Sequence, residues 1–526
     1  MWPRWGCEFQ IERRTLVTLI NLQDVAVTLS EPLFADLSLT LAKSDRLGIV
    51  AANGRGKSTL LGILAGHISP TSGDITTARG LRAELVPQDL PDELRDLCMF
   101  DAVLAGIDEE QAEFESWRVN IALEDLHVPA DIWQTPIEDL SGGWQRVALL
   151  ARAWVREPDV LLIDEPTNHL DLHRIGVLQT WLSTVARRTA CVIASHDRAF
   201  LDTVTNRTLF LRPQNSPQFA LPYSAARVAV DEADAADARR FENEVAKADQ
   251  LRRQAAKLKN VGINSGSDLL LTKTKQLQER ANKLERSARP AHVENSAGKI
   301  RLSNSGTHAK ALVTFEEAEI TTPDGAPLFK TGQMWINRGD RIIVQGANGS
   351  GKSCLLSLVI AALAEPQAGL RVAPTVVPGV SDQSLSQLDP FKSPLDAVLS
   401  RSDVGDQNAR TLLASAGIRI THQSQAINRL SGGQQSRLAM LILRLTHPNF
   451  YILDEPTNHL DIEGQEALEV ELQKHDATAL LVSHDRSFVR NVGTRFWQIN
   501  RARLIETDSP EAFFVDQLGE DMPRLG

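Results

Sequence analysis

At two places an apolar run leads into a glycine-rich turn and then into a second apolar stretch: LGIVAANGRGKSTLL at 47–61 and IIVQGANGSGKSCLL at 342–356. An apolar run of this length indicates a buried strand, and the glycines after it indicate a tight turn that opens a helix. Two other apolar runs end in acidic residues, VLLIDEPTNHLD at 160–171 and FYILDEPTNHLD at 450–461. Strands that alternate with helices in this way predict an α/β fold.

The same patterns recur along the chain with a nearly constant separation. Four pairs of positions follow in the same order, each about 290 residues apart: Lys57 and Lys352, Ser141 and Ser431, Asp164 and Asp454, His196 and His484. Self-similarity at a fixed offset indicates a repeated domain. We therefore expect two copies of one α/β domain in tandem.

Each glycine-rich turn predicts a phosphate-binding loop. Backbone N–H groups in such a turn, with the N-terminus of the following helix, surround a nucleotide β-phosphate. A lysine then reaches the β- and γ-phosphates, and a serine hydroxyl binds Mg²⁺. The candidate ATP-binding residues are Asn53, Gly54, Gly56, Lys57, Ser58 and Thr59 in the first loop and Gly346, Asn348, Gly349, Gly351, Lys352 and Ser353 in the second. The first loop departs from the usual pattern because it begins with Ala51 instead of glycine.

The acidic residues after the second pair of strands predict the hydrolytic chemistry. Asp164 and Asp454 end the strands and would hold Mg²⁺, together with Ser58 and Ser353. Glu165 and Glu455 follow directly, where a carboxylate can orient or deprotonate the attacking water. The simpler alternative is a helix cap or a solvated turn. The two phosphate loops upstream favour the catalytic interpretation.

A Leu-Ser-Gly-Gly sequence precedes each acidic strand, as LSGGWQR at 140–146 and LSGGQQS at 430–436. At these residues the chain resembles tandem ATP-binding cassette proteins. The resemblance implies that the signature residues of one cassette close over the γ-phosphate that the opposite cassette holds; they are Ser141, Gly142, Gly143, Ser431, Gly432 and Gly433. Trp144 stands where the family usually has glutamine.

The family resemblance assigns roles to further residues. It implies that Gln88 and Gln383 contact Mg²⁺ and the attacking water, that Asp171 and Asp461 belong to the D-loops, and that His196 and His484 contact the γ-phosphate as switch histidines. The residues that stack on adenine have no clear counterpart. Phe34 and Phe329 are the candidates.

Both acidic segments read Glu-Pro-Thr-Asn-His-Leu-Asp, at 165–171 and 455–461, which resembles the F subfamily of cassette proteins. The resemblance implies an ATPase whose two cassettes pair within one chain. It also implies that the linker hairpin enters the ribosomal exit site, near the P-site tRNA and the peptidyl-transferase region. The alternative is an ATP-binding subunit of a transporter with separately encoded membrane partners. Between a translation factor and a factor that protects ribosomes from antibiotics the sequence does not decide.

The linker between the cassettes predicts a basic helical hairpin. Helix-favouring residues occupy about 231–289, interrupted by VGINSGS at 261–267. Ten basic and three acidic residues lie between Arg252 and Arg289, a net charge of +7 in a chain of net charge −11. Such a patch suits a phosphate backbone, and the alternative is a solvated coiled coil. The candidate RNA contacts are Arg252, Arg253, Lys257, Lys259, Lys273 and Lys275.

The length of 526 residues and an apolar content of 42% suit several folded domains. We expect a disordered lead at 1–16, a first cassette at 17–211, a charged linker at 212–310, a second cassette at 311–510 and a short tail at 511–526. No apolar run reaches the roughly 18 residues that a bilayer span needs. The four cysteines show no C-x-x-C spacing, so we expect reduced thiols in a soluble cytoplasmic protein and no zinc module of the DNA-repair type.

Overall fold

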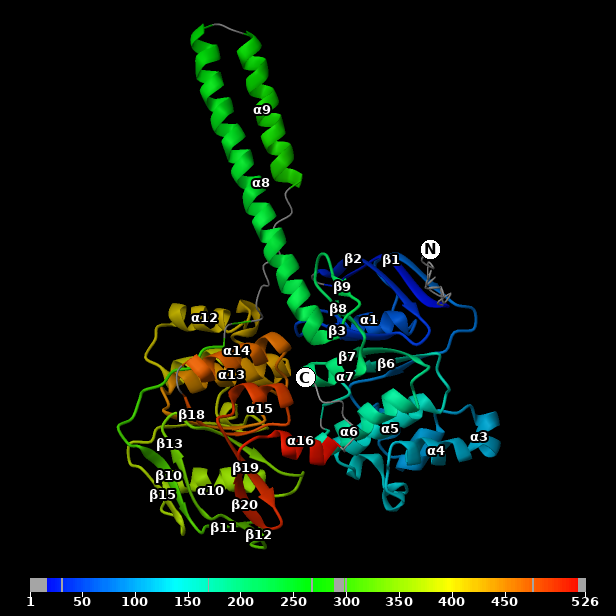
Figure 1. The fold of residues 1–526 in the computed structure, drawn as a ribbon, viewed down its shortest axis with the longest axis vertical. Coiled ribbons are helices and arrows are strands. Elements are labelled where there is room, and N and C mark those ends of the chain that lie inside the picture. Colours follow the sequence, from blue (N-terminus) through cyan, green and yellow to red (C-terminus); the bar gives the residue numbers. More distant parts are fainter. Residues whose placement is uncertain are drawn as a thin grey trace, which may run out of the picture. The chain divides into compact units, whose positions relative to one another are not determined.

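The computed structural model describes residues 17–29, 32–168, 170–265, 268–287, 298, 300–474 and 477–518. The expected disordered lead at 1–16 lies outside the described residues. Residue contacts divide the chain into two compact units, Met1–Pro222 with Ala297–Gly526, and Tyr223–Ser296. Figure 1 shows the first unit as two mixed α/β cassettes and the second as two long antiparallel helices.

The first cassette combines a three-stranded antiparallel sheet, β2-β1-β4, with a six-stranded, mostly parallel sheet of order β5-β6-β7-β3-β8-β9. Its strands are β1 (Thr18–Thr28), β2 (Pro32–Ala42), β3 (Arg46–Val50), β4 (Ser72–Thr77), β5 (Ala83–Val86), β6 (Val160–Asp164), β7 (Ala190–Ala194), β8 (Arg207–Phe210) and β9 (Gln218–Phe219). Its helices are α1 (Lys57–Leu64), α2 (Met99–Leu104), α3 (Glu109–Glu115), α4 (Trp117–Asp125), α5 (Gly142–Trp154), α6 (Leu172–Thr184) and α7 (Arg198–Val204).

The second cassette repeats this architecture. Its main sheet contains the order β16-β17-β18-β14-β19-β20, which matches the first cassette strand for strand, and β12 and β11 extend the β20 edge. Its strands are β10 (Ala311–Glu316), β11 (Glu319–Thr321), β12 (Pro327–Lys330), β13 (Gln333–Asn337), β14 (Arg341–Gln345), β15 (Leu370–Val372), β16 (Pro378–Ser381), β17 (Phe450–Asp454), β18 (Thr478–Val482), β19 (Arg495–Asn500) and β20 (Arg503–Thr507). Its helices are α10 (Lys352–Ala364), α11 (Pro394–Arg401), α12 (Asp406–Ser415), α13 (Gly432–Leu445), α14 (Ile462–Lys474), α15 (Arg486–Val492) and α16 (Glu511–Leu518).

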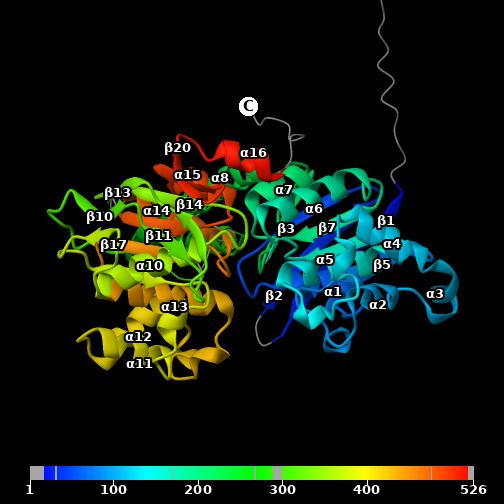
Figure 2. The ribbon, with the colours of Figure 1, turned by 90° about the horizontal axis from the view of Figure 1, so that it is seen from below.

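The central strands are continuous apolar runs because they are covered on both faces. Every residue of β6, β7 and β18 is buried. Figures 1 and 2 show β3 and β7 between helix α1 on one face and α7 on the other. Helices on both faces require apolar side chains in both directions along a strand. The parallel order brings the carboxyl ends of β3, β6 and β7 to one edge, where the predicted site residues begin.

The segment 511–526, assigned from the sequence to a short tail, begins with helix α16. Phe513 and Phe514 are buried in the core of the second cassette. The same helix packs on α6 of the first cassette, where a Cβ added at Gly176 would lie 2.8 Å from the Leu518 carbonyl oxygen. Helix α16 is therefore part of the folded body and joins the two cassettes.

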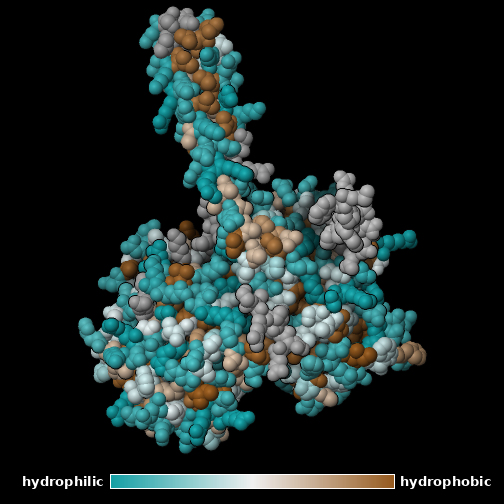
Figure 3. All heavy atoms as spheres, in the orientation of Figure 1, coloured by the Kyte–Doolittle hydropathy of each residue, from teal (hydrophilic) through white to brown (hydrophobic). Residues whose placement is uncertain are grey.

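The hairpin unit consists of α8 (Tyr223–Ser265) and α9 (Asp268–Ser287). Helix α8 begins before the expected start near residue 231, and it continues through 261–265, where the sequence analysis expects a break. Ala248, Ala255 and Ala281 are fully buried between the helices, because their small side chains allow close approach. Exposed apolar side chains gather near the tip, at Ile263 and Leu269, where Figure 3 shows a hydrophobic strip.

Candidate active sites at two phosphate loops

Each predicted phosphate loop connects a strand to a helix, β3 to α1 and β14 to α10. The last loop residues, Gly56 and Gly351, cap the helices with φ angles of 89° and 98°. A side chain at these positions would be strained, since residues with a Cβ rarely adopt positive φ. The backbone N–H groups at the start of each helix thus face an approaching anion.

In the first loop, the lysine reaches the acidic strand end. Lys57 Nζ lies 2.9 Å from Glu165 Oε1 and also contacts the His196 ring. The His196 ring lies 3.1 Å from Asn53 Oδ1, and its backbone N–H donates to Glu165 Oε2 over 3.1 Å. The structure therefore brings four predicted site residues of the first cassette together.

In the second loop, the lysine bonds the loop itself. Lys352 Nζ donates to the carbonyl oxygens of Gly346 and Ala347 over 2.8 and 3.1 Å. Glu455 Oε2 accepts the backbone N–H of His484 over 3.2 Å, as in the first cassette. The two copies thus share the contact between glutamate and histidine and differ in the partner of the lysine.

The local backbone places both glutamates in an unusual conformation. Glu165 and Glu455 have φ angles of 48° and 50°. Left-handed backbone at a residue with a side chain is uncommon and is often found at functional sites. It turns each carboxylate back toward the carboxyl end of the neighbouring strand.

The aspartates one position earlier fit a divalent cation. Ser353 donates its hydroxyl to Asp454 Oδ2 over 2.8 Å, and Ser58 makes the same bond to Asp164. Asp164 Oδ1 is buried and has no hydrogen-bond partner among the described residues. One hydroxyl and one carboxylate suit Mg²⁺, which takes its other ligands from water and phosphate. Within the described ranges, no cluster of three or more metal-binding side chains occurs that would hold an ion without a nucleotide.

The two glutamates differ in proton affinity. Burial alone raises the pKa of Glu165, but His196 and Lys57 outweigh it and hold this pKa below its usual value. Burial raises the pKa of Glu455 to about 8; the charge of Asp454 adds to this rise, and the His484 backbone N–H and Lys352 only partly oppose it. Burial also lowers the pKa of both switch histidines to about 4, so their rings are neutral at pH 7.

The first phosphate loop is covered by the second cassette. Asn53 donates its backbone N–H to Asp461 Oδ2 over 3.1 Å and its side-chain amide to the His459 carbonyl over 2.8 Å. A Cβ added to the signature residue Gly433 would lie 2.6 Å from Asn53 Nδ2, so only glycine fits there. The D-loop and signature of the second cassette therefore meet the phosphate loop of the first.

In the reverse pairing, the contact that the described residues show acts through charge. Burial lowers the pKa of Lys352 and of His484 in the second cassette, and the charge of Asp171 opposes that shift in both. Asp171 itself caps α6 by accepting the Arg174 N–H over 2.9 Å. Among the described residues no hydrogen bond joins Asp171 to Asn348, the counterpart of Asn53.

The two signature helices also begin differently. Ser431 and Gln434 form a reciprocal capping box, in which each side chain bonds the backbone of the other. Ser141 makes no such cap, because Trp144 stands in the glutamine position. The Trp144 ring instead lies under the guanidinium of Arg174, 4.1 Å from its carbon. The signature of the first cassette is therefore tied to its own D-loop helix.

Two buried arginines that were not predicted support these loops. Arg437 donates to the D-loop Asp461 over 3.0 Å. Arg146 bonds the Asp164 carbonyl and the Pro87 carbonyl. They occupy positions one residue apart in the two copies, after LSGGQQS and LSGGWQ. A residue-by-residue alignment of the two signature segments shows an arginine near the same place in each copy. This recurrence is the signal that could have identified both arginines.

Four candidates make no contact with the acidic residues of these sites among the described residues. Gln88 and Gln383 are exposed, and among the described residues their side chains bond none of the acidic residues. Phe34 and Phe329, considered for adenine stacking, are 0% and 2% exposed and belong to the cores of the two cassettes. The adenine assignment is wrong for both, because a ring packed on all sides offers no face to a base.

All six candidate RNA contacts lie on the hairpin, and five of them are exposed. Arg253, Lys257, Lys259, Lys273 and Lys275 are exposed. Arg252 is paired across the hairpin with Glu285, which raises its pKa. Five of the six side chains therefore present their charge to solvent.

The chain is similar to known proteins over nearly its whole length. Residues 34–168 and 329–458 each match the family described as ABC transporter. The ATP-binding protein Uup of Caulobacter vibrioides is 30% identical over 506 residues, covering 93% of this chain and 78% of the relative. Uup of Escherichia coli is 29% identical, covering 91% and 80%, and ABC transporter F family member 5 of Arabidopsis thaliana is 28% identical, covering 92% and 75%.

Solved structures share the fold. A crystal structure of an archaeal ribosome recycling factor in complex with a ribosomal stalk protein matches with a TM-score of 0.62 at 19% identity, over 94% of this chain and 92% of the other. RNase-L Inhibitor matches with a TM-score of 0.62 at 20% identity, over 94% and 93%. None of the helices in the described ranges is long and apolar enough to cross a membrane.

Proposed function

The chain belongs to the F subfamily of the ATP-binding cassette ATPases, and from this premise we propose that it binds the ribosome through its linker hairpin and leaves when ATP is hydrolysed. Each ATP would lie between the phosphate loop of one cassette and the signature of the other. The contact between Asn53 and Asp461 supports this arrangement for the first site.

Each residue of a site has a distinct task in hydrolysis. The lysines Lys57 and Lys352 stabilise charge on the β- and γ-phosphates, and the switch histidines, neutral at pH 7, bond the γ-phosphate. Glu165 and Glu455 orient and deprotonate the attacking water. Ser58 with Asp164, and Ser353 with Asp454, would hold Mg²⁺, which would neutralise charge on the phosphates. The exposed Gln88 and Gln383 would join this ion and the water when the cassettes close.

The observation that carries the ribosome proposal is the exposed charge of the hairpin. Its basic side chains are exposed on a pair of antiparallel helices, in a chain of net charge −11. Phosphate contacts of this kind are independent of sequence and weaken with salt. The solved structures that match at 19–20% identity share the fold only, so the charge and the subfamily carry the proposal. A ribosome-bound role places the protein in the cytoplasm, against ribosomal RNA and the P-site tRNA.

The test is co-sedimentation with ribosomes of the double variant Glu165→Gln and Glu455→Gln, which would hold ATP without turnover. We expect retention that requires ATP and falls steeply with salt. In the same background, glutamine at Lys257, Lys259, Lys273 and Lys275 should weaken binding at least about tenfold, since each lost phosphate contact removes part of the salt-dependent free energy.

The matched control removes the same charge from the cassette surface, with glutamine at the exposed residues Lys43, Arg79, Arg187 and Arg188. This variant should bind ribosomes as the parent does. Equal weakening by both sets would contradict hairpin binding. Failure of the double variant to bind ribosomes, with co-fractionation in membranes, would favour the transporter-subunit alternative. Translation assays with and without ribosome-targeting antibiotics would then separate a general translation factor from a protection factor.

A further inference from the structure

The turn after each switch histidine carries an aspartate and an arginine, and these turns meet between the cassettes. Asp197 caps α7 by accepting the Phe200 N–H over 2.8 Å. Asp485 caps α15 by accepting the Phe488 N–H over 3.0 Å. The arginines, Arg198 and Arg486, are the first residues of these helices. Each aspartate is thereby fixed to its helix; Asp485 turns its other oxygen, Oδ2, toward the opposite cassette, and Asp197 faces it with the capping Oδ1 itself.

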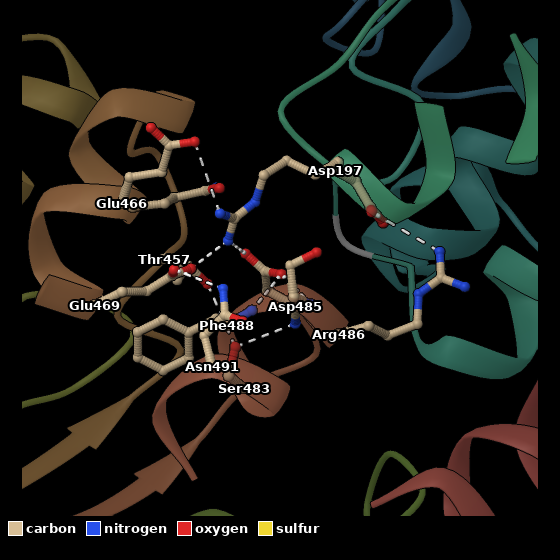
Figure 4. A network of polar contacts seen from close by, with 12 residues as sticks. Asp197, Thr457, Glu466, Glu469, Ser483, Asp485, Arg486, Phe488 and Asn491 are labelled. Carbon is tan, nitrogen blue, oxygen red and sulfur yellow. Dashed lines mark hydrogen bonds and ion pairs between the residues drawn. The ribbon is translucent and has the colours of Figure 1, made fainter. Parts of the chain in front are cut away.

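The arginines cross between the cassettes. Arg198 of the first cassette lies 3.7 Å from Asp485 Oδ2 of the second, and Arg486 of the second lies 3.8 Å from Asp197 Oδ1 of the first. Figure 4 shows Arg486 directed at Asp197, and Asp485 on the facing turn. All four side chains are at most 13% exposed. In so dry an environment, charge pairs interact more strongly than at the surface.

The two crossings are unequal because α14 adds acidic residues on one side only. Arg198 contacts Glu469 directly and lies 4.0 Å from Glu466. At the same offset of about 290 residues, the first cassette has Gln179 and Gly176. Within the described part of the chain, both amide atoms of Gln179 have no hydrogen-bond partner, so Gln179 does not take the place of Glu469 toward Arg486. Arg198 is therefore held by a carboxylate cradle that Arg486 lacks.

Each turn is bonded to a candidate catalytic glutamate. The backbone N–H of His196 donates to Glu165 Oε2, and that of His484 donates to Glu455 Oε2, over 3.1 and 3.2 Å. A short path thus runs from Glu165 through the first turn, across the pair of Arg198 and Asp485, and through the second turn to Glu455. This path crosses between the cassettes at the pair of Arg198 and Asp485, and the pair of Arg486 and Asp197 provides a second crossing.

We propose that Arg198 and Arg486 are positioning residues that couple the two ATP sites, and that Arg198 carries the larger share. When one site closes on ATP and moves its histidine turn, the crossed ion pairs move the opposite turn and its glutamate. This inference rests on the proposed role of Glu165 and Glu455 and is independent of the ribosome. Coupling between the sites is the quantity that tests it.

The measurement is ATP turnover by full-length variants in which one site is disabled. If the sites are independent, the rates of Glu165→Gln and Glu455→Gln add up to the rate of their parent. With coupling, we expect their sum to fall at least about fivefold short, within the usual range of coupling. When the two glutamate variants are made in the Arg198→Gln background, the sum of their rates should match the rate of Arg198→Gln alone within about twofold. In the Arg486→Gln background the sum should stay further below the rate of Arg486→Gln alone.

The controls separate coupling from folding. Arg198→Lys keeps the charge and should keep most of the shortfall. Arg198→Gln with Asp485→Asn removes both charges while asparagine preserves the helix cap, so it should fold and behave as Arg198→Gln does. Arg490→Ala breaks a pair within the second cassette, with Glu511, and should keep the full shortfall.

An equal shortfall in the wild-type and Arg198→Gln backgrounds would overturn the proposed role of Arg198. Rates that already add up in the wild-type background would overturn coupling of the sites. Wild-type turnover in both single glutamate variants would instead overturn the catalytic assignment on which the inference rests.

Discussion

The two phosphate loops share one sequence pattern but differ in their electrostatics. In the first cassette Lys57 is paired with Glu165, whose pKa is held below its usual value. In the second cassette Lys352 bonds its own loop, and burial raises the pKa of Glu455. The same sequence pattern therefore does not determine which of its residues form ion pairs with one another. His196 and Lys57 together keep Glu165 ready to act as a base, whereas burial and Asp454 favour the protonated form of Glu455.

The contacts that each phosphate loop makes with the opposite cassette also differ. Asp461 of the second cassette, supported by Arg437, bonds the first loop through Asn53. Asp171 of the first cassette caps its own helix α6, as Asp461 caps α14, but among the described residues no hydrogen bond joins Asp171 to the second loop. The asymmetry thus extends from the lysines to the loops that cross between the cassettes.

Disabling the glutamates should have the largest effect. We expect the double variant Glu165→Gln and Glu455→Gln to lose at least about 100-fold in ATP turnover, because general base catalysis contributes that much or more. Binding of ATP should persist, as measured by equilibrium binding of a fluorescent analogue. The exposed Glu365→Gln is the matched control and should turn over ATP normally. Residual turnover within tenfold of wild type would contradict the assignment of both glutamates.

The two phosphate-loop lysines should contribute unequally to the free energy of unfolding. Lys57→Ala leaves the buried Glu165 without its cation, which should lower the free energy of unfolding by about 3 kcal/mol. Lys352→Ala removes two bonds to carbonyl groups and should cost about 1 kcal/mol. Urea unfolding measures both. Adding Glu165→Gln to Lys57→Ala should restore much of the loss, and equal losses for the two lysines would remove the distinction between the loops.

Replacing Trp144 in the first signature should have the smallest effect on ATP turnover. Trp144→Gln loses the stacking of Arg174 and allows a capping box with Ser141, so the two changes in stability nearly cancel. Since Ser141 serves the second site, kcat/KM should change about two- to fivefold in the Glu165→Gln background, corresponding to roughly 0.5–1 kcal/mol. The reciprocal Gln434→Trp tests the first site in the Glu455→Gln background. Identical responses of the two sites would show that the signature difference is neutral.

Much of this architecture could be predicted from the sequence, because the signals are local. A glycine-rich turn between an apolar strand and a helix, or an acidic pair at a strand end, has the same meaning wherever it occurs. The repeat then fixed the correspondence of the cassettes, and the matching strand orders confirm the tandem α/β fold. The structure also places Lys57, Glu165 and His196 in one cluster.

Contacts between distant segments could not be predicted. Asn53 and Asp461, or Arg198 and Asp485, are brought together only when the cassettes pack, and each has an ordinary local role as a loop residue or helix cap. Phe34 and Phe329 show the opposite error, since an aromatic residue near a phosphate loop was assigned to a base although it completes a core. Helix α16 lacked a strong sequence signal because it is short and is stabilised by tertiary packing.

The pH dependence of kcat/KM in the two single-site variants tests most directly whether the sites are inequivalent, since kcat/KM reports the pKa values of the free enzyme. In Glu165→Gln only Glu455 can act, and its base form is lost as the pH falls through about 8. We expect kcat/KM to rise about tenfold from pH 7 to pH 9. In Glu455→Gln the acting residue is Glu165, whose lowered pKa keeps it ionised over that range, so kcat/KM should stay flat. Superimposable profiles in the two variants would contradict the account.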